Sequence, residues 1–167
     1  MSFSLLPKII VPALTDVSEE LLHSRGVKLL MLDFDNTIVP YTTSTPTDAM
    51  EAWLRKMAAS DIRLCVVSNS KKNRVKIFCE KYGIDCITHA NKPFPKGIVE
   101  CLEKYCIDPK ECALVGDQIF TDTLGANGCN VTSILVKAID NHNIWLKLRH
   151  VAEMPFILMA SNRRIKL

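Results

Sequence analysis

Apolar and polar residues follow two different periods along the chain. Five short runs rich in apolar and β-branched residues predict strands, at residues 27–34, 62–68, 85–89, 112–117 and 131–136. Between these runs, apolar residues return every three or four positions, as they do on one face of a helix. Strands that alternate with helices predict right-handed βαβ units and therefore a parallel sheet.

Three of the intervening segments carry a clear helical face. Their apolar residues follow the spacing i, i+3, i+4, i+7 in three sets: Met50, Trp53, Leu54 and Met57; Val75, Phe78, Cys79 and Tyr82; Ile98, Cys101, Leu102 and Tyr105. Helices of this kind cover both faces of a parallel sheet. We therefore expect an α/β fold with a doubly wound parallel sheet, in a single domain that spans residues 1–167.

Polar groups collect where the predicted strands end. The first, second and fourth strands lead into carboxylates, a hydroxyl and an amide: Asp33, Asp35, Ser68, Asn69, Asp117 and Asp122. The segment "NKPFPKG" (91–97), between the third and fourth strands, adds two lysines. Because ligands of open α/β sheets bind at the carboxyl ends of the strands, these residues predict one site for an anion and a divalent cation.

The neighbouring carboxylates of Asp33 and Asp35 require compensation. Side chains two positions apart on an extended chain point to the same side, where two negative charges repel each other. A cation, a shared proton or a set of hydrogen-bond donors can relieve that repulsion. Several carboxylate oxygens at one site suit Mg²⁺, which also accepts phosphate oxygens as ligands, so we expect Mg²⁺ as the cofactor.

Two other kinds of metal site do not fit the sequence. A calcium loop of the EF-hand type that begins at Asp33 needs Gly at its sixth position and Glu at its twelfth, but those positions hold Ile38 and Ser44. The seven cysteines are scattered and form no C-x-x-C pair. We interpret them as small buried side chains in a reducing compartment rather than as zinc ligands.

Composition limits the partners and the location. The net charge of +3 on 167 residues is too small to argue for nucleic acid. No apolar run approaches the roughly 18 residues of a membrane span. The amino-terminal residues lack the pattern of a signal or transit peptide. We expect a cytoplasmic protein that binds no nucleic acid.

Four segments in order carry a family resemblance. "LDFDNT" (32–37), "VVSNS" (66–70), "NKPFPKG" (91–97) and "GDQIFTD" (116–122) resemble motifs I to IV of the haloacid dehalogenase-like (HAD) phosphatases. Residues 5–137 are similar to one branch, the YqeG-like phosphatases of HAD subfamily IIIA, which are related to phosphatidylglycerophosphate phosphatases. Four motifs in the correct order are specific, whereas any single one is weak. The resemblance implies a phosphatase with a HAD-like Rossmannoid fold.

The resemblance also implies catalytic roles. Asp33 would be the nucleophile that forms an aspartyl-phosphate, and Asp35 would be the general acid and then the general base. Lys92 would neutralise charge on the phosphate and on the aspartyl intermediate. Lys96 competes with Lys92 for this role, although the Lys-Pro-x-Pro spacing of the family favours Lys92.

The remaining roles implied by the resemblance concern ligands. The side chain of Asp33, the backbone carbonyl of Asp35 and the side chain of Asp117 would bind Mg²⁺, with Asp122 in or near the outer shell. The phosphoryl oxygens would accept hydrogen bonds from three polar residues: Thr37, Ser68 and Asn69.

The lengths between motifs restrict the substrate. From Asp33 to Ser68 is 35 residues and from Ser68 to Lys92 is 24, which leaves no room for an inserted cap domain. We therefore expect an open site for a phosphomonoester on a large molecule, and the resemblance favours a phospholipid head group such as phosphatidylglycerophosphate. The alternatives are a phosphatase for a soluble phosphometabolite and a catalytically idle HAD module that acts as an interaction protein.

The carboxyl-terminal residues 138–167 allow three interpretations. "MPFILMASNRRIKL" (154–167) is apolar and then basic, as segments at a membrane surface often are. Such a segment also packs onto a core or onto a second subunit. The sequence thus leaves open peripheral membrane contact and the choice between a monomer and a homodimer.

Overall fold

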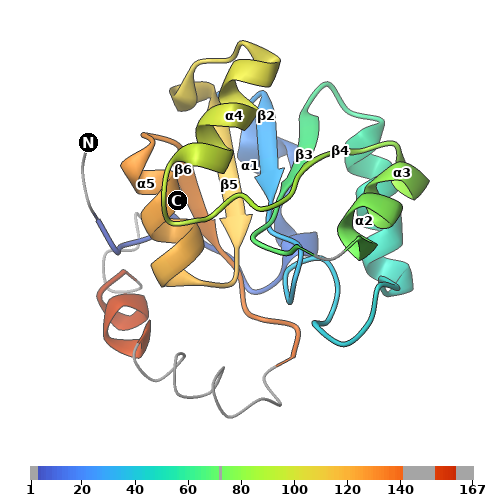
Figure 1. The fold of residues 1–167 in the computed structure, drawn as a ribbon. Coiled ribbons are helices and arrows are strands. Elements are labelled where there is room, and N and C mark those ends of the chain that lie inside the picture. The colour runs from blue at the N-terminus through green and yellow to red at the C-terminus, as the bar shows by residue number, and fades with distance from the viewer. Residues whose placement is uncertain (1–3, 72, 141–152, 161–167) are drawn as a thin grey trace.

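A six-stranded parallel sheet forms the centre of the protein. The computed structural model describes residues 4–71, 73–140 and 153–160. The strand order is β1-β6-β5-β2-β3-β4, and every neighbouring pair is parallel (Figure 1). The strands are β1 (Ile9–Ile10), β2 (Leu29–Leu32), β3 (Arg63–Val67), β4 (Asp85–Ile87), β5 (Cys112–Gly116) and β6 (Thr132–Leu135).

Five of these strands lie within the apolar runs that predicted them, and β1 is the exception. It has only two residues, in which Ile9 pairs with Ile134 and Ile10 with Leu135 of β6. The preceding Lys8 donates its backbone N–H to the hydroxyl of Ser133 at 3.0 Å. Contacts with residues more than a hundred positions away hold β1 in place, and a local sequence pattern cannot predict them.

Helices connect the strands. They are α1 (Glu19–His23), α2 (Asp48–Ala58), α3 (Arg74–Tyr82), α4 (Lys96–Tyr105) and α5 (Leu124–Gly128), joined by 3₁₀ turns at Leu14–Asp16 and Pro109–Glu111 and a π-helical turn at Ile119–Thr123. Residues 153–160 form a further helix. The helices α2, α3 and α4 coincide with the three predicted apolar faces. In the described part of the chain, no helix has the length and hydropathy that crossing a bilayer requires.

Local sequence signals mark one end of α2 and one end of α3. The hydroxyl of Thr47 accepts the N–H of Met50 at 3.3 Å and so caps the start of α2. Gly83 ends α3 with φ of +64°, a left-handed conformation that costs glycine little. Thr47 thus marks where α2 begins, and Gly83 marks where α3 ends and the chain continues into β4.

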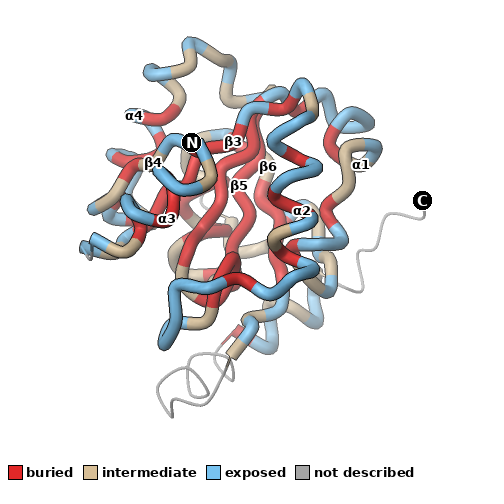
Figure 2. The backbone as a smooth tube through the Cα atoms, turned by 90° about the vertical axis from the view of Figure 1, so that its right-hand side faces the viewer, coloured by how far each residue is buried: buried red, intermediate tan, exposed pale blue. Residues whose placement is uncertain are grey.

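Side chains of the strands alternate between two apolar layers. Leu30 and Leu32 of β2 belong to the cluster that contains buried residues of α1, α2 and α3. Leu29 and Met31 belong to the cluster on the other face, together with Ile98 of α4. Figure 2 shows the strands as a buried centre, with the exposed residues on helices and loops. Helices on both faces of a parallel sheet confirm the expected doubly wound α/β fold.

The strand order places the polar strand ends side by side. β2 lies between β3 and β5, with Leu32 opposite Val66 on one side and Val115 on the other. Asp33 continues this ladder, since its N–H donates to the carbonyl of Val115 at 2.9 Å. The residues that follow β2, β3 and β5 therefore meet at one edge of the sheet.

This edge carries no inserted domain in the described residues. All residues between Asp33 and Lys92 except Lys72 are described, and they form α2, β3, α3 and β4 with their connections. The lengths between the motifs correctly predicted this compact arrangement.

Candidate active site

The chain turns sharply after β2, which brings Thr37 back toward the end of the strand. The N–H of Asn36 donates to the carbonyl of Val39 at 2.7 Å. Asn36 has φ of +64°, a conformation that asparagine adopts more readily than most residues. The buried hydroxyl of Thr37 consequently lies 3.4 Å from Oδ2 of Asp33 and 3.5 Å from Oδ1 of Asp117.

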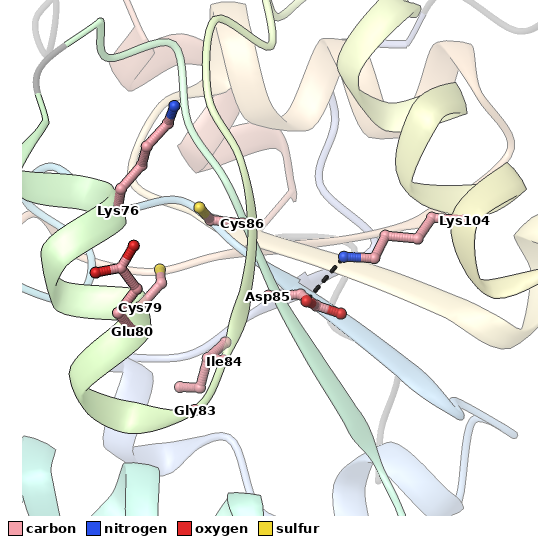
Figure 3. A pocket seen from close by; sticks show the side chains of 8 residues that line it. All are labelled: Lys76, Cys79, Glu80, Gly83, Ile84, Asp85, Cys86 and Lys104. Carbon is pink, nitrogen blue, oxygen red and sulfur yellow. Dashed lines mark ion pairs between the residues drawn. The ribbon is translucent and has the colours of Figure 1, made fainter.

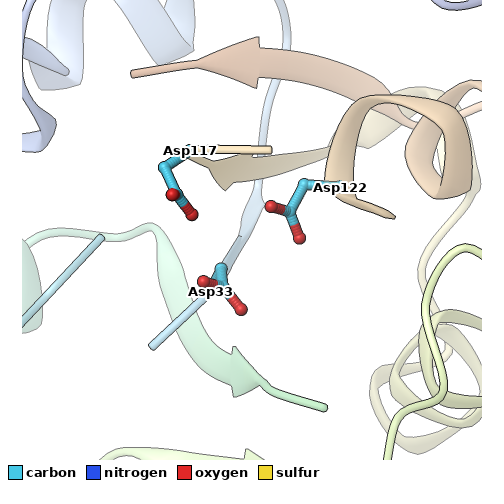
Figure 4. A group of neighbouring side chains, drawn as sticks. All are labelled: Asp33, Asp117 and Asp122. Atoms are coloured by element: carbon cyan, nitrogen blue, oxygen red, sulfur yellow. The ribbon is translucent and has the colours of Figure 1, made fainter. Parts of the chain in front are cut away.

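Three buried carboxylates converge at this edge of the sheet (Figure 4). Asp33 follows β2, Asp117 follows β5, and Asp122 lies in the π-helical turn after β5. Each offers one ligand atom, and these three atoms lie within 4.8 Å of one another. Oδ1 of Asp122 is buried, and no described residue offers it a well-aligned hydrogen-bond donor. Carboxylates so close together require cations, and their oxygen atoms fit Mg²⁺.

Lys92 supplies a positive charge among these carboxylates. Its Nζ lies 2.8 Å from Oδ1 of Asp33 and 2.7 Å from Oδ1 of Asp122. The carboxamide of Asn69 fixes the backbone of Lys92, donating to its carbonyl at 2.8 Å and accepting its N–H at 2.7 Å. Lys96, by contrast, is exposed at the start of α4. The structure therefore brings Lys92, rather than Lys96, to the carboxylates.

Burial and charge act against each other within this cluster. Burial lowers the pKa of Lys92, but the charges of Asp122 and Asp33 outweigh it and raise the pKa of the ammonium above its ordinary value. The pKa of Asp122 is raised to about 6, mainly by burial and also by the charge of Asp33, against the opposing charge of Lys92. Lys92 is therefore protonated at neutral pH, and a further cation near Asp122 would stabilise its ionised form.

Gly116 makes the approach of Asp122 possible. A Cβ atom at position 116 would lie 2.2 Å from Cγ and 2.3 Å from Oδ2 of Asp122, far inside van der Waals contact. The N–H of Gln118 donates to the same Oδ2 at 3.1 Å and holds the carboxylate there. Glycine at 116, the last residue of β5, is thus required by the packing of Asp122.

Ser68 and Asn69, which we expected to bind phosphoryl oxygens, follow β3. Ser68 is buried, its N–H donates to the carbonyl of Ile87 at 2.9 Å, and its hydroxyl accepts the N–H of Ser70 at 3.1 Å. The carboxamide of Asn69 is engaged with Lys92, a role in holding the lysine that the sequence analysis missed. The phosphate contacts of Thr37, Ser68 and Asn69 stay predictions.

The carboxylate of Asp35 has a different partner from that of Asp33. Nη2 of Arg74 donates to Oδ1 of Asp35, and the group of three converging carboxylates does not include Asp35. Metal binding by the backbone carbonyl of Asp35 stays a prediction. The sequence analysis left Arg74 without a role, although Arg74 belongs to the basic run "KKNR" (71–74), which begins three positions after the end of the second predicted strand.

Residues 153–160 pack against the site. The buried carboxylate of Glu153 accepts the N–H of Ile119 at 3.0 Å. The rings of Phe120 and Phe156 meet edge to face, with 6.2 Å between their centroids. This helix therefore contacts the turn that carries Asp122, and no local pattern could have identified Glu153. Residues 141–152 and 161–167 lie outside the described residues, and with them lies the basic end of the segment "MPFILMASNRRIKL".

Solved structures share this fold. The cobalt-bound deoxy-D-mannose-octulosonate 8-phosphate phosphatase of Haemophilus influenzae matches with a TM-score of 0.53 and 9% identity, over 82% of this chain and 91% of that one. A HAD-superfamily hydrolase of subfamily IA from Geobacter sulfurreducens has a TM-score of 0.51 and 14% identity, over 70% and 90% of the two chains. Identities this low show the fold alone, and the fold is that of the HAD hydrolases.

Sequence comparison identifies the family within this class. Residues 2–139 match the family described as "Mitochondrial PGP phosphatase", and the chain belongs to this family. The Bacillus subtilis protein named "Probable phosphatase YqeG" is 34% identical over 131 residues, which are 78% of this chain and 76% of that protein. The mitochondrial phosphatidylglycerophosphatase GEP4 of Saccharomyces cerevisiae is 33% identical over 135 residues, 72% of this chain and 71% of that protein. The chain is therefore a phosphatase, which confirms the identification from the four motifs.

Proposed function

We propose that the protein hydrolyses a phosphomonoester with Mg²⁺ through a covalent aspartyl-phosphate on Asp33. The observation that carries this proposal is the position of Lys92 between Asp33 and Asp122, with Asp117 in the same group. A nucleophile, a fixed positive charge and a set of metal ligands surround one point. Phosphoryl transfer depends mainly on such positioning and charge neutralisation.

The proposed reaction has two steps. First, a carboxylate oxygen of Asp33 attacks the phosphorus, the bond to the ester oxygen breaks, and Asp35 gives its proton to the leaving oxygen. Second, water attacks the phosphorus of the aspartyl-phosphate, Asp35 takes a proton from that water, and inorganic phosphate leaves as the carboxylate of Asp33 is restored. Lys92 stays protonated throughout and offsets the charge that Asp33 shares with the phosphoryl oxygens.

The carboxylates would hold the metal ion. Asp33 and Asp117 would bind Mg²⁺ together with the backbone carbonyl of Asp35. Asp122 lies close enough to bind the ion directly or through a water molecule in the outer shell. Bound Mg²⁺ would polarise the phosphoryl group and offset the charge of the three carboxylates.

Substitution of the nucleophile tests this mechanism. We expect Asp33→Asn to lower the turnover of 4-nitrophenyl phosphate by at least about a thousand-fold, because an amide cannot form the phosphorylated intermediate. Chelation of Mg²⁺ should abolish the activity of the unaltered protein. Circular dichroism of the variant checks that the fold is intact. Full activity in Asp33→Asn would overturn the assignment of the nucleophile.

The substrate that we propose is phosphatidylglycerophosphate. The description of the family and the name of the yeast relative both point to this lipid. The absence of an inserted domain in the described residues between Asp33 and Lys92 leaves space for a phosphate on a large molecule. A lipid head group at a membrane surface is such a phosphate.

Exposed apolar side chains near the carboxyl edge of the sheet support contact with a lipid surface. Tyr41 follows the turn after β2, Phe94 follows Lys92 by two residues, and Ile139 donates its N–H to the carbonyl of Asn36 at 2.9 Å. Residues 153–160 add three more exposed apolar side chains: Met154, Leu158 and Met159. Exposed lysines in loops and helix starts at this edge would attract anionic head groups: Lys71, Lys96 and Lys137.

A turnover panel tests the substrate. We expect phosphatidylglycerophosphate in mixed micelles to be hydrolysed at least about ten-fold faster than sugar phosphates, nucleotides or phosphopeptides at equal concentration. Strong preference for a soluble phosphometabolite would contradict the assignment of the lipid as substrate but not the phosphatase mechanism. No turnover of any ester would instead favour an interaction module. Met159→Ser should weaken activity on micelles and spare activity on 4-nitrophenyl phosphate.

Location and assembly stay predictions. The sequence analysis expects a cytoplasmic protein that is a monomer or a homodimer, whereas the yeast relative is named mitochondrial. Fractionation of cells and the mass of the purified protein in solution would decide these two points.

A further inference from the structure

Arg74 connects the start of α3 to the turn that carries Asp35. Its Nη2 donates to Oδ1 of Asp35, and its Nη1 donates to the carbonyl of Thr43 at 2.5 Å. The two ends of the guanidinium thus bind a side chain and a backbone group of the same segment. The side chains of Arg74 and Asp35 are only 16% and 19% exposed. This arrangement joins residues that lie 39 positions apart in the sequence.

Two aromatic rings of the same segment fix the orientation of the guanidinium. The Cζ atom of Arg74 lies 5.2 Å from the centroid of Phe34 and 5.8 Å from that of Tyr41. Each ring attracts the cation through its electron-rich face. Phe34 is fully buried and lies between Asp33 and Asp35 in the sequence. The guanidinium therefore has little freedom relative to the turn after β2.

The chain also contains an arginine pair of the ordinary surface type. Arg55 bonds Glu51 at 2.8 Å one turn earlier in α2, and its side chain is 75% exposed. Arg74 is different, because its Nε is buried and has no hydrogen-bond partner among the described residues. Burying an unpaired donor is unfavourable, so stability alone is a poor explanation for the burial of Arg74.

We infer that Arg74 is a positioning residue, which holds the carboxylate of Asp35 in the orientation needed for proton exchange with the leaving oxygen. This inference rests on the proposed function, in which Asp35 is the general acid. Proton transfer requires a hydrogen-bond distance between the acid and the leaving oxygen, so a carboxylate free to rotate reacts less often. Both Nη groups are already engaged and Nε is enclosed, which favours positioning over direct binding of the substrate.

The dependence of the hydrolysis rate on the leaving group distinguishes a positioning role from a merely structural one. 4-Nitrophenolate departs readily without a proton, whereas phenolate departs poorly without one. Loss of the orientation of Asp35 should therefore slow the hydrolysis of phenyl phosphate more than that of 4-nitrophenyl phosphate. kcat/KM measures this effect, because it includes the step in which Asp33 is phosphorylated and the leaving group departs.

The experiment compares Arg74→Ala and Arg74→Lys with the unaltered full chain in the presence of Mg²⁺. For Arg74→Ala we expect kcat/KM to fall about a hundred-fold on phenyl phosphate and less than about ten-fold on 4-nitrophenyl phosphate, with the loss in kcat. Arg74→Lys should recover only part of the lost kcat/KM, since lysine cannot bind two acceptors with one planar fork. Arg55→Ala is the matched control, and we expect it to keep the activity of the unaltered protein on both esters.

The variant Asp35→Asn tests the role of Asp35 in the proposed function separately from the positioning role of Arg74. This variant should lose turnover on phenyl phosphate at least as strongly as Arg74→Ala, and the double variant should be no worse than Asp35→Asn alone. An Asp35→Asn variant with unchanged kinetics would overturn the role of Asp35 in the proposed function. Where Asp35→Asn behaves as expected, an equal loss on both esters in the Arg74 variants, or a loss in KM alone, overturns the positioning role.

Arg74→Lys keeps the test decisive if Arg74→Ala fails to fold. It retains the positive charge and most of the packing volume, and its melting temperature can be compared with that of Arg55→Ala. A folded Arg74→Lys with the same kcat/KM as the unaltered protein on both esters also overturns the inference.

Discussion

Two lysine–aspartate clusters lie at opposite ends of β4. Lys92 follows the carboxyl end of this strand, while Lys104, near the end of α4, reaches Asp85 at its amino end. The nitrogen–oxygen distance is 2.8 Å in both Lys92–Asp33 and Lys104–Asp85. The exposure differs: the side chains of Lys92 and Asp33 are 1% and 9% exposed, and those of Lys104 and Asp85 are 45% and 49% exposed.

The exposed cluster behaves as ordinary surface structure. Asp85 and Lys104 line a pocket of about 400 Å³, together with Cys79 and Cys86 (Figure 3). Hydrogen bonds from Lys104 and then from Tyr105 lower the pKa of Asp85. Because about half of each charged side chain stays in water, the pair contributes no more than about 1 kcal/mol to stability.

The buried cluster is poorly explained by stability. Each charge loses several kcal/mol of hydration on burial, and one lysine cannot compensate three carboxylates. Apolar residues of similar volume would stabilise the fold at least as well. Burial, rather than distance, therefore separates the two clusters, and it marks the buried one as the candidate for binding and catalysis.

The largest expected difference between the clusters is in activity. Lys92→Ala should lower kcat/KM on 4-nitrophenyl phosphate by about a thousand-fold, because it removes the fixed charge beside Asp33. Lys104→Ala makes the same chemical change at the other cluster and should stay within about two-fold of the unaltered protein. Steady-state kinetics with Mg²⁺ measures kcat/KM of both variants. If Lys92→Ala does not fold, Lys92→Arg takes its place. Similar losses of kcat/KM in Lys92→Ala and Lys104→Ala would contradict the distinction between the buried and the exposed cluster.

The response to Mg²⁺ sharpens the comparison further. Saturating Mg²⁺ should raise the melting temperature by roughly 5–10 °C, because it binds the folded carboxylates and not the unfolded chain. Asp117→Asn should be more stable than the unaltered protein without metal and should lose this shift. Asp85→Asn should keep it. Differential scanning calorimetry measures all three, and a full shift in Asp117→Asn would show that the ion binds elsewhere.

Packing around the buried cluster gives a smaller effect. Gly116→Ala should destabilise the fold by about 1–3 kcal/mol, because the new Cβ overlaps the side chain of Asp122. Gly128→Ala is the matched control, since a Cβ there meets nothing within 4 Å. Urea denaturation gives both free energies of unfolding. If the two alanines have equal effects, Asp122 moves aside at little cost and its position is not as tightly determined as we infer.

The smallest effect is expected at the exposed pair. A double-mutant cycle with Asp85→Asn and Lys104→Ala should give a coupling energy of about 0.5 kcal/mol, and 1 M salt should reduce it further. A coupling above about 2 kcal/mol would mean that exposure does not separate the two clusters.

Several elements were predictable because their signals are local. The apolar runs placed β2, β3, β4, β5 and β6, and the helical spacing placed α2, α3 and α4, since both patterns repeat within a few residues. β1 escaped prediction because two residues carry no period. The Lys-Pro-x-Pro spacing favoured Lys92 over Lys96, but only the packed loop shows which side chain lies at the carboxylates.

The sequence by itself determined the class of protein, the doubly wound fold and the residues that gather at the carboxyl edge. Each motif follows a strand, and parallel strands necessarily bring their ends together. Only the tertiary structure decided the pairings within that edge. Asp122 and Asp33 both form ion pairs with Lys92. The side chain of Asn69 bonds the backbone of Lys92, and Asp35 forms an ion pair with Arg74. These contacts join segments 23 to 59 residues apart, and the order of strands in the sheet, not any local pattern, sets which of them meet.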